Sequence, residues 1–149
     1  MIRDRTIGMG FRGLLAIVTT VAAFGCGPSP ITSPRIASAI APTFANLVQV
    51  QISRLGMPSM AASDFAVAAS CRRLATGSNS GAGDWACTLV WRGPHHQALT
   101  DTYDLTVSTD GCYTATIEGE ELGGPTIKAS DGRDVRNLLY AFEGCFETM

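Results

Sequence analysis

Five cysteines constrain the fold of this chain more than any other feature, because four of them can be paired and one is left over. The first, Cys26, follows the apolar segment 13–24, and the others come later: Cys71, Cys87, Cys112 and Cys145. Four cysteines in an exported chain are most simply two disulfides, for which three connectivities are possible. We favour Cys71 with Cys87 and Cys112 with Cys145. No C-x-x-C pair is present, so we expect neither a zinc site nor another metal or cofactor.

The first 25 residues have the pattern of an export signal peptide. Arg3, Arg5 and Arg12 give a positively charged start, and residues 13–24 form an uncharged apolar run. A helix that spans a bilayer needs about 20 apolar residues, and this run has twelve before it meets Gly-Pro-Ser-Pro. We therefore expect residues 1–25 to direct export and to be removed.

The residues around Cys26 resemble the lipobox of bacterial lipoproteins, in which the cysteine is acylated and becomes the first residue of the mature chain. The sequence before it is Ala-Phe-Gly, and Ala23 stands where the motif most often has leucine. The alternative is a free or disulfide-bonded Cys26. With a lipid on Cys26, residues 26–38 would form an extended tether from the outer face of the cytoplasmic membrane to a single domain at 39–149.

The mature chain is long enough for one domain, and its charge is acidic. Residues 26–149 number 124 and carry 8 arginines or lysines against 12 aspartates or glutamates. Binding to nucleic acid needs clustered positive charge, so we do not expect nucleic acid as a partner. Ten of the acids lie in residues 101–149, which predicts an acidic end or face.

An amphipathic helix is predicted at the start of the domain. Apolar residues recur there at helical spacing: Phe44, Leu47, Val48, Ile52 and Leu55. Pro42 suits a first helical turn, and Gly56 followed by Pro58 ends the pattern. We expect a helix over about 42–55, with its apolar face packed on a sheet.

The later segments alternate apolar and polar residues, as half-buried strands do. Residues 65–71 predict a strand with Phe65, Val67, Ala69 and Cys71 on one face, although the many alanines leave a helix as the alternative. Residues 85–91 alternate more strongly. Residues 101–117 form the clearest hairpin, with an Asp-Gly turn at 110–111.

The C-terminal part supplies a shorter strand and an apolar tail. A strand is predicted at 126–129, followed by a second Asp-Gly turn at 131–132. The apolar tail 135–146 must dock on the domain, and a Cys112–Cys145 disulfide would fix it beside the hairpin. We expect an α+β fold: one N-terminal amphipathic helix packed on an antiparallel sheet of four to five strands, with a disulfide-pinned C-terminal tail.

Several segments carry a family resemblance: "APTFANL", "GDWACTLVW", "TDTYDLTVSTDGCYTATIEG", "LGGPTI" and "NLLYAFEGCF". Together they resemble small secreted lipoproteins of unknown function from actinobacteria, over most of residues 40–147. The layout of a strand cysteine, a glycine-rich loop and "CTL" is also similar to a second group of secreted actinobacterial domains of unknown function. The resemblance implies export, a cysteine at the mature start and a single small α+β domain. It implies no activity and no catalytic residues.

Residues that could carry chemistry are few. His95 and His96 lie together in a Gly-Pro loop, and a hydrolytic site would have to combine them with Asp101 or Asp104. We regard an exposed hairpin tip as the default. Three further acids lack the spacing of a calcium loop and are assigned to a solvated acidic edge: Glu118, Glu120 and Glu121.

Four aromatic residues could form a platform for a sugar or peptide, but their alternation with apolar residues favours core packing: Trp85, Trp91, Tyr103 and Tyr113. Trp91 and Tyr103 are placed at strand ends, so of the four we expect these two to be partly exposed. Arg72 and Arg73 are expected along the sheet edge or against acidic residues, in the same domain or in a partner.

These observations favour a non-catalytic lipoprotein that acts as a binding or accessory module of the cell envelope, with an envelope protein or ligand as its partner. The alternatives are a small envelope hydrolase that uses His95 or His96 with Asp101 or Asp104, and a secreted inhibitor. A hydrolase needs a pocket in which these groups converge, whereas a binding module can present an exposed apolar or charged patch.

Overall fold

The computed structural model describes residues 30–148, so the predicted signal peptide and Cys26 lie outside the described residues. Within them the chain forms one α-helix, one 3-10 turn and seven strands. In order these are α1 (Ser33–Arg54), η1 (Ala62–Phe65), β1 (Ala68–Arg73), β2 (Gly83–Arg92), β3 (Ala98–Val107), β4 (Cys112–Ile117), β5 (Thr126–Lys128), β6 (Asp134–Arg136) and β7 (Ala141–Cys145).

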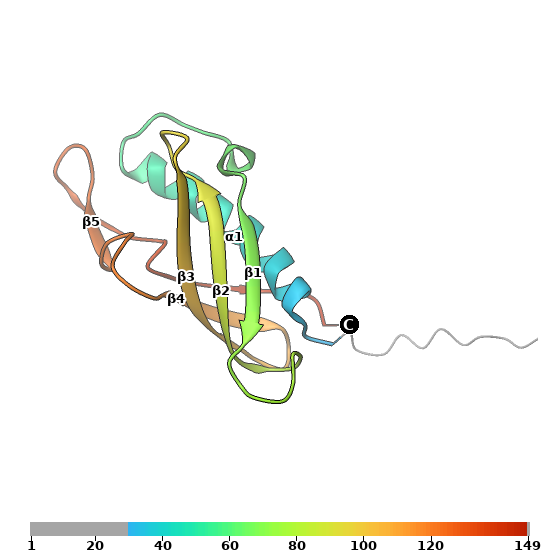
Figure 1. The fold of residues 1–149 in the computed structure, drawn as a ribbon. Helices are drawn as coiled ribbons and strands as arrows, with labels where there is room; N and C mark the ends of the chain where they lie inside the picture. Colours follow the sequence, from blue (N-terminus) through green and yellow to red (C-terminus); the bar gives the residue numbers. More distant parts are fainter. Residues whose placement is uncertain (1–29, 149) are drawn as a thin grey trace, which may run out of the picture.

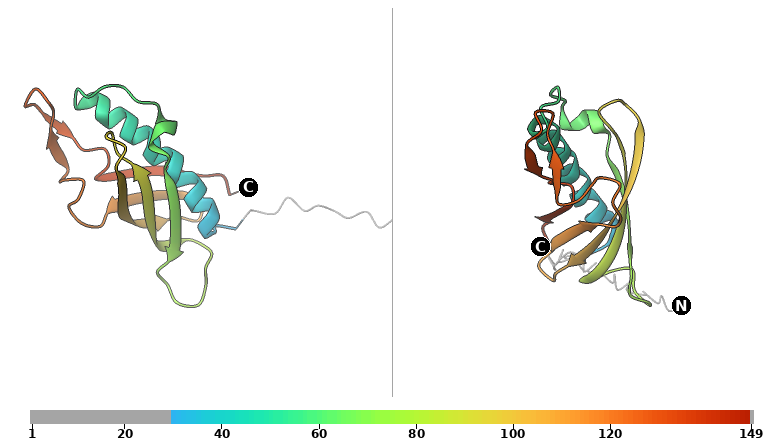
Figure 2. Two further views of the ribbon diagram at one scale, coloured as in Figure 1. Left: turned by 45° about the horizontal axis from the view of Figure 1, so that its top comes forward. Right: turned by 90° about the vertical axis from the view of Figure 1, so that its left-hand side faces the viewer.

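Five strands form one antiparallel sheet in the order β1-β2-β3-β4-β7, and β5 pairs with β6 in a separate hairpin (Figure 1). Helix α1 crosses one face of the five-stranded sheet, and the β5–β6 hairpin lies near the C-terminal end of the helix (Figure 2). We call the face that carries α1 the inner face and the opposite one the outer face. The predicted α+β class, one helix on an antiparallel sheet, is confirmed.

The helix begins nine residues earlier than predicted, at Ser33 instead of Pro42. Residues 33–38, which sequence analysis assigned to the tether, are therefore helical. The buried stripe continues backward at four-residue spacing through Ile40 and Ile36, both fully buried. Pro42 lies inside the helix on its exposed side, where the carbonyl of Ser38 that loses its helical N–H donor can reach water.

The strand predicted at 65–71 begins only at Ala68, so the helical alternative for this segment is wrong. Phe65 is fully buried, but it belongs to η1 rather than to the strand. Ala66 follows with φ of 45°, a left-handed conformation that turns the chain into β1. Burial of Phe65 thus comes from a local turn and not from the alternation of a strand.

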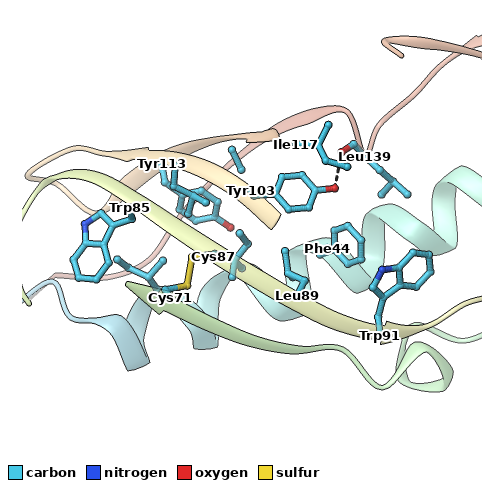
Figure 3. Close-up of a cluster of buried hydrophobic side chains, with 14 of the residues drawn as sticks. Phe44, Cys71, Trp85, Cys87, Leu89, Trp91, Tyr103, Tyr113, Ile117 and Leu139 are labelled. Atoms are coloured by element: carbon cyan, nitrogen blue, oxygen red, sulfur yellow. Dashed lines mark hydrogen bonds between the residues drawn. A yellow bond between two sulfur atoms is a disulfide. The ribbon is translucent and has the colours of Figure 1, made fainter. Parts of the chain in front are cut away.

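The core lies between α1 and the inner face. Phe44 is at its centre, with its ring 5.4 Å from that of Trp91 and 5.8 Å from that of Tyr103, both edge to face (Figure 3). The prediction that Trp91 and Tyr103 are partly exposed is wrong, because both are buried, with 4% and 0% of their surfaces exposed. Strands β2 and β3 run past both residues, and Phe65 covers Trp91.

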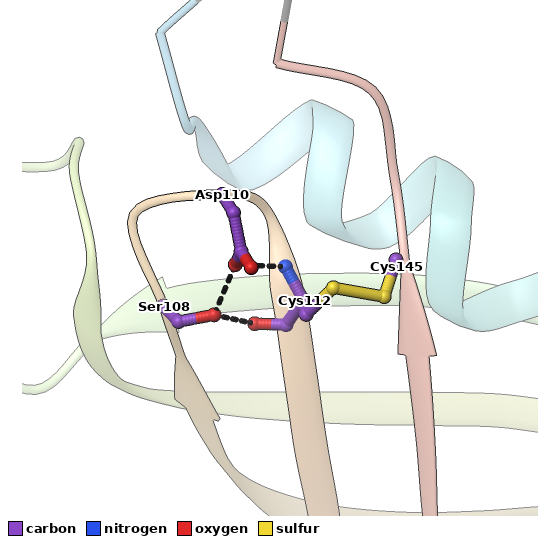
Figure 4. The surroundings of a disulfide bond; sticks show 4 residues. All are labelled: Ser108, Asp110, Cys112 and Cys145. Atoms are coloured by element: carbon purple, nitrogen blue, oxygen red, sulfur yellow. Dashed lines mark hydrogen bonds between the residues drawn. A yellow bond between two sulfur atoms is a disulfide. The ribbon is translucent and has the colours of Figure 1, made fainter.

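Both disulfides join residues that lie directly opposite each other on neighbouring strands. Cys71–Cys87 is on the inner face, inside the core (Figure 3). Cys112–Cys145 is on the outer face, where Cys145 is exposed (Figure 4). This is the pairing that sequence analysis favoured.

The tail is held by hydrogen bonds as well as by the second disulfide. Asn137, 2% exposed, donates from Nδ2 to the carbonyl oxygens of Leu122 and Gly124, and its Oδ1 accepts from the backbone N–H of Leu139. Gln51 of α1 accepts the N–H of Leu138 at 2.8 Å. These bonds bring the tail across the inner side, and its last described residues reach the start of α1, where Arg35 donates to the carbonyl of Glu147 (Figure 1).

Candidate binding surface on the outer sheet face

The histidines lie at an exposed turn and not in a pocket. The β2–β3 connection is a tight turn in which the His96 N–H donates to the Gly93 carbonyl, and His96 has a left-handed φ of 61°. Both imidazoles are exposed, and within residues 30–148 neither makes a hydrogen bond or ion pair with a carboxylate.

The two aspartates proposed as their partners are on opposite faces of β3. Asp104 is exposed on the outer face. Asp101 points into the core, where its Oδ2 accepts a 2.6 Å hydrogen bond from Nε1 of Trp91. Burial raises the pKa of Asp101, the bond from Trp91 lowers it, and the negative charge of Glu121 raises it further. The structure does not assemble the histidine–carboxylate site.

The remaining candidates also occupy ordinary positions. Glu118, Glu120 and Glu121 are exposed, and no cluster in the described part of the chain could hold a metal ion. All four candidate platform aromatics are buried in the core. Arg73 donates to the carbonyl oxygens of Ser80 and Ala82, whereas Arg72 is exposed. No helix among residues 30–148 is long and apolar enough to cross a membrane.

The outer face is the surface that stands out, because hydroxyl groups line it. Successive side chains of each strand point to opposite faces of the sheet, so the residues that do not point into the core lie on this face. On β2, β3 and β4 six of these residues are threonines: Thr88, Thr100, Thr102, Thr106, Thr114 and Thr116. Thr88 is paired with Thr102, and Thr106 with Thr114, so their hydroxyls lie side by side on neighbouring strands in two pairs.

Three adjoining hollows indent this face, and Thr114 lines all of them. The largest, about 510 Å³, runs along the Cys112–Cys145 disulfide with Glu143 on its wall. The second, about 370 Å³, lies over Asp84 and Asp104. The third, about 260 Å³, lies beside Arg136. We call the three together the outer trough.

Negative charge predominates in the outer trough. Asp84, Asp104 and Glu143 contribute carboxylates, and Arg136 is the one basic residue among the side chains that line it. Asp84 accepts a 3.1 Å hydrogen bond from the hydroxyl of Thr106, which fixes one carboxylate on the wall. The trough can therefore offer carboxylate and hydroxyl oxygens together to a ligand that donates hydrogen bonds.

Sequence reasoning missed this surface, although a signal was present. The segment 100–106 and the segment 114–116 place threonines at every second position with one aspartate among them. That pattern predicts polar residues on one strand face, but it does not show that the face is hollow. The hollow depends on the pairing of β7 with β4, which brings Glu143 and the disulfide beside Thr114.

Comparisons with protein-family models, with curated proteins and with solved structures found no match to this chain.

Proposed function

We propose that this protein is an exported, non-catalytic binding module of the cell envelope, anchored through a lipid on Cys26, and that the outer trough is its ligand site. The observation that carries the proposal is the trough itself. It combines three adjoining hollows, the hydroxyl groups that line them and an excess of carboxylates on a sheet that two disulfides brace. Rigid walls reduce the ordering cost that binding would otherwise incur.

The chemistry of the walls indicates the ligand class. Carboxylates and hydroxyls accept hydrogen bonds, and charged donors form the stronger bonds with carboxylates. We therefore assign a polar ligand that carries ammonium or guanidinium groups, such as a basic peptide segment. The disulfides support the proposed extracytoplasmic location, since such bonds persist in oxidising compartments.

A titration with hexalysine peptide, followed by amide chemical shifts of the purified chain, tests the ligand site. We expect shifts at Thr106, Thr114 and Glu143, which Thr114→Arg abolishes by filling the trough and adding positive charge. Thr126→Arg, at an exposed threonine of the β5–β6 hairpin, is the matched control and should keep the shifts. Shifts absent from the trough, or unchanged by Thr114→Arg, would contradict the assignment.

The intact mass of the chain from its native membrane tests the anchor independently. A chain that starts at Cys26, carries acyl groups and exposes four thiols only after reduction supports it. In Cys26→Ser the acyl mass should disappear and the protein should leave the membrane fraction. A wild-type mass without acyl groups would refute the anchor and leave the ligand site standing.

A further inference from the structure

We propose that the part of the outer face formed by β1, β2 and β3 binds a second copy of this chain, in a dimer whose two-fold axis runs along β2. Opposite charges flank β2 at one level of the sheet. Arg72 on β1 and Asp104 on β3 are both paired with Ala86 of β2. Both charged residues are exposed, and neither forms an ion pair within residues 30–148.

A two-fold rotation about an axis along β2 satisfies these charges. It places β1 of one copy over β3 of the other and keeps every residue at its own level along the strands. Arg72 then faces Asp104 of the second copy, and the contact occurs twice. Packed sheets lie about 10 Å apart, a gap that an extended arginine side chain spans. Ala86, small and 6% exposed, lies on the axis and allows close approach.

The exposed apolar residues fit the same arrangement. Val90 and Leu74, 48% and 45% exposed, are two of the three large apolar side chains exposed in the described residues. Val90 of β2 lies on the axis, so it packs against Val90 of the second copy. Leu74 follows β1 and comes to lie opposite Thr106 of the second copy, where the 370 Å³ hollow can receive it.

The size of the surface predicts a weak dimer. Three strands over seven residues cover roughly 330 Å² in projection, below the ~800 Å² per partner of a standard interface. Packed sheets cross at about −30°, so the two β2 strands diverge towards their ends. This divergence separates Asp84 and Arg92 from the same residues of the second copy. The dimer covers the hollow over Asp84 and Asp104, so there it competes with the ligand assigned above, and it leaves the other two hollows of the outer trough open beyond β3.

The position of the N-terminus suits two copies on one membrane. Ile31 accepts a 2.8 Å hydrogen bond from the N–H of Gly81, and Thr32 is bridged to Ser80, so the chain enters at the end of the sheet where β1 stops. Rotation about an axis along the strands keeps both entry points at the same end. This orientation argument, unlike the charge pattern, rests on the proposed anchor, which would also raise the local concentration.

Thiol cross-linking of the full chain in its native membrane tests the dimer. Because Val90 lies on the axis and the sheets are about 10 Å apart, too far for a direct disulfide, Val90→Cys should be joined into a dimer by a short bis-maleimide, seen on a denaturing gel. Val50→Cys, similarly exposed but on α1, is the control and should not be cross-linked. Equal yields from the two variants would overturn the proposal.

Charge reversal in the Val90→Cys background then tests the orientation. Arg72→Glu and Asp104→Arg should each lower the yield about tenfold, because each replaces two attractions by repulsions. The double variant should restore it. A double variant as poor as the single ones would overturn the axis along β2. Acyl mass reports the anchor separately, so a dimer without acyl groups would refute the anchor alone.

Discussion

The indole Nε1 of Trp91 donates a 2.6 Å hydrogen bond to Oδ2 of Asp101, and both residues are buried between the inner face and the elements that cover it. The bond links β2 to β3 near the turn that joins them. It satisfies the one polar atom of the tryptophan and explains how a carboxylate can lie in this core. It also removes Asp101 from any role beside the histidines.

Loss of the Asp101 carboxylate should destabilise the fold. Asp101→Ala leaves the Trp91 N–H buried without a partner, which costs about 1–3 kcal/mol of unfolding free energy. Asp104→Ala, three residues away on the outer face, should change stability by less than about 0.5 kcal/mol. Urea unfolding of both variants measures the difference, and equal losses would contradict the structural assignment.

The same carboxylate should make stability fall as the pH rises. Burial raises the pKa of Asp101 above its usual 3.8, so around that pH the folded protein holds a proton that the unfolded chain releases. The stabilising contribution of the protonated Asp101 carboxyl group is complete below pH 3.8 and is lost as the pH rises through the raised pKa. Asp101→Asn removes the titration and keeps an oxygen for Trp91. The melting temperatures of the wild type and of Asp101→Asn, plotted from pH 3.5 to 7, should therefore converge or cross. Parallel plots would refute the shift.

Two buried tyrosines on the inner face should respond in opposite ways to loss of their hydroxyl groups. Tyr103 donates to the carbonyl of Leu139 at 2.7 Å, so Tyr103→Phe should cost about 1 kcal/mol. The Tyr113 hydroxyl is buried and has no hydrogen-bond partner among residues 30–148, so Tyr113→Phe should be neutral or stabilising. Chemical unfolding of both variants provides the comparison. A larger loss for Tyr113→Phe than for Tyr103→Phe would show that the partner assignment is wrong.

Mild reduction should open one disulfide before the other. Cys112–Cys145 lines the outer trough, where a thiolate can reach it, whereas Cys71–Cys87 is inside the core. Limited treatment with a phosphine, followed by alkylation and peptide mass mapping, should label Cys112 and Cys145 first. Simultaneous labelling of all four cysteines without unfolding would contradict the difference in access.

Removal of the outer disulfide should loosen the tail. Cys145→Ser opens a loop of 34 residues, which the loop-entropy model values at about 4 kcal/mol. The free Cys112 should then react with thiol reagents, and limited proteolysis should cut within the C-terminal segment. If the variant were as protease-resistant as the wild type, the hydrogen bonds of Asn137 and Gln51 alone would be sufficient to hold the tail.

The strands and their faces were predictable because alternation is a local property of the sequence. Trp85, Leu89 and Leu105 lie inward as predicted, and the Asp-Gly turn at 110–111 joins β3 to β4. The helix start was not found, because Pro42 was interpreted as a first-turn residue. The four-residue spacing through Ile36 and Ile40 was the stronger signal, and Pro34 in fact occupies the first turn.

The candidate site was less predictable because it depends on distant contacts. The side to which Asp101 and Asp104 point follows from alternation, but the partner of Asp101 depends on the register between β2 and β3. The outer trough requires β7 to pair with β4, more than twenty residues away in the sequence. No local pattern specifies such a pairing, although the two cysteines that it brings together give a hint.

Each margin of the five-stranded sheet is covalently fastened to the strand beside it. Strands β1 and β7 are the outermost, and their cysteines are bonded to β2 and β4 at residues directly opposite. Outermost strands are where sheets fray and where strands are exchanged between chains. While both bonds are intact, neither strand can peel away under load or swap into a neighbouring molecule. Two copies can therefore associate through the surfaces of their folded domains, but not by exchanging an edge strand.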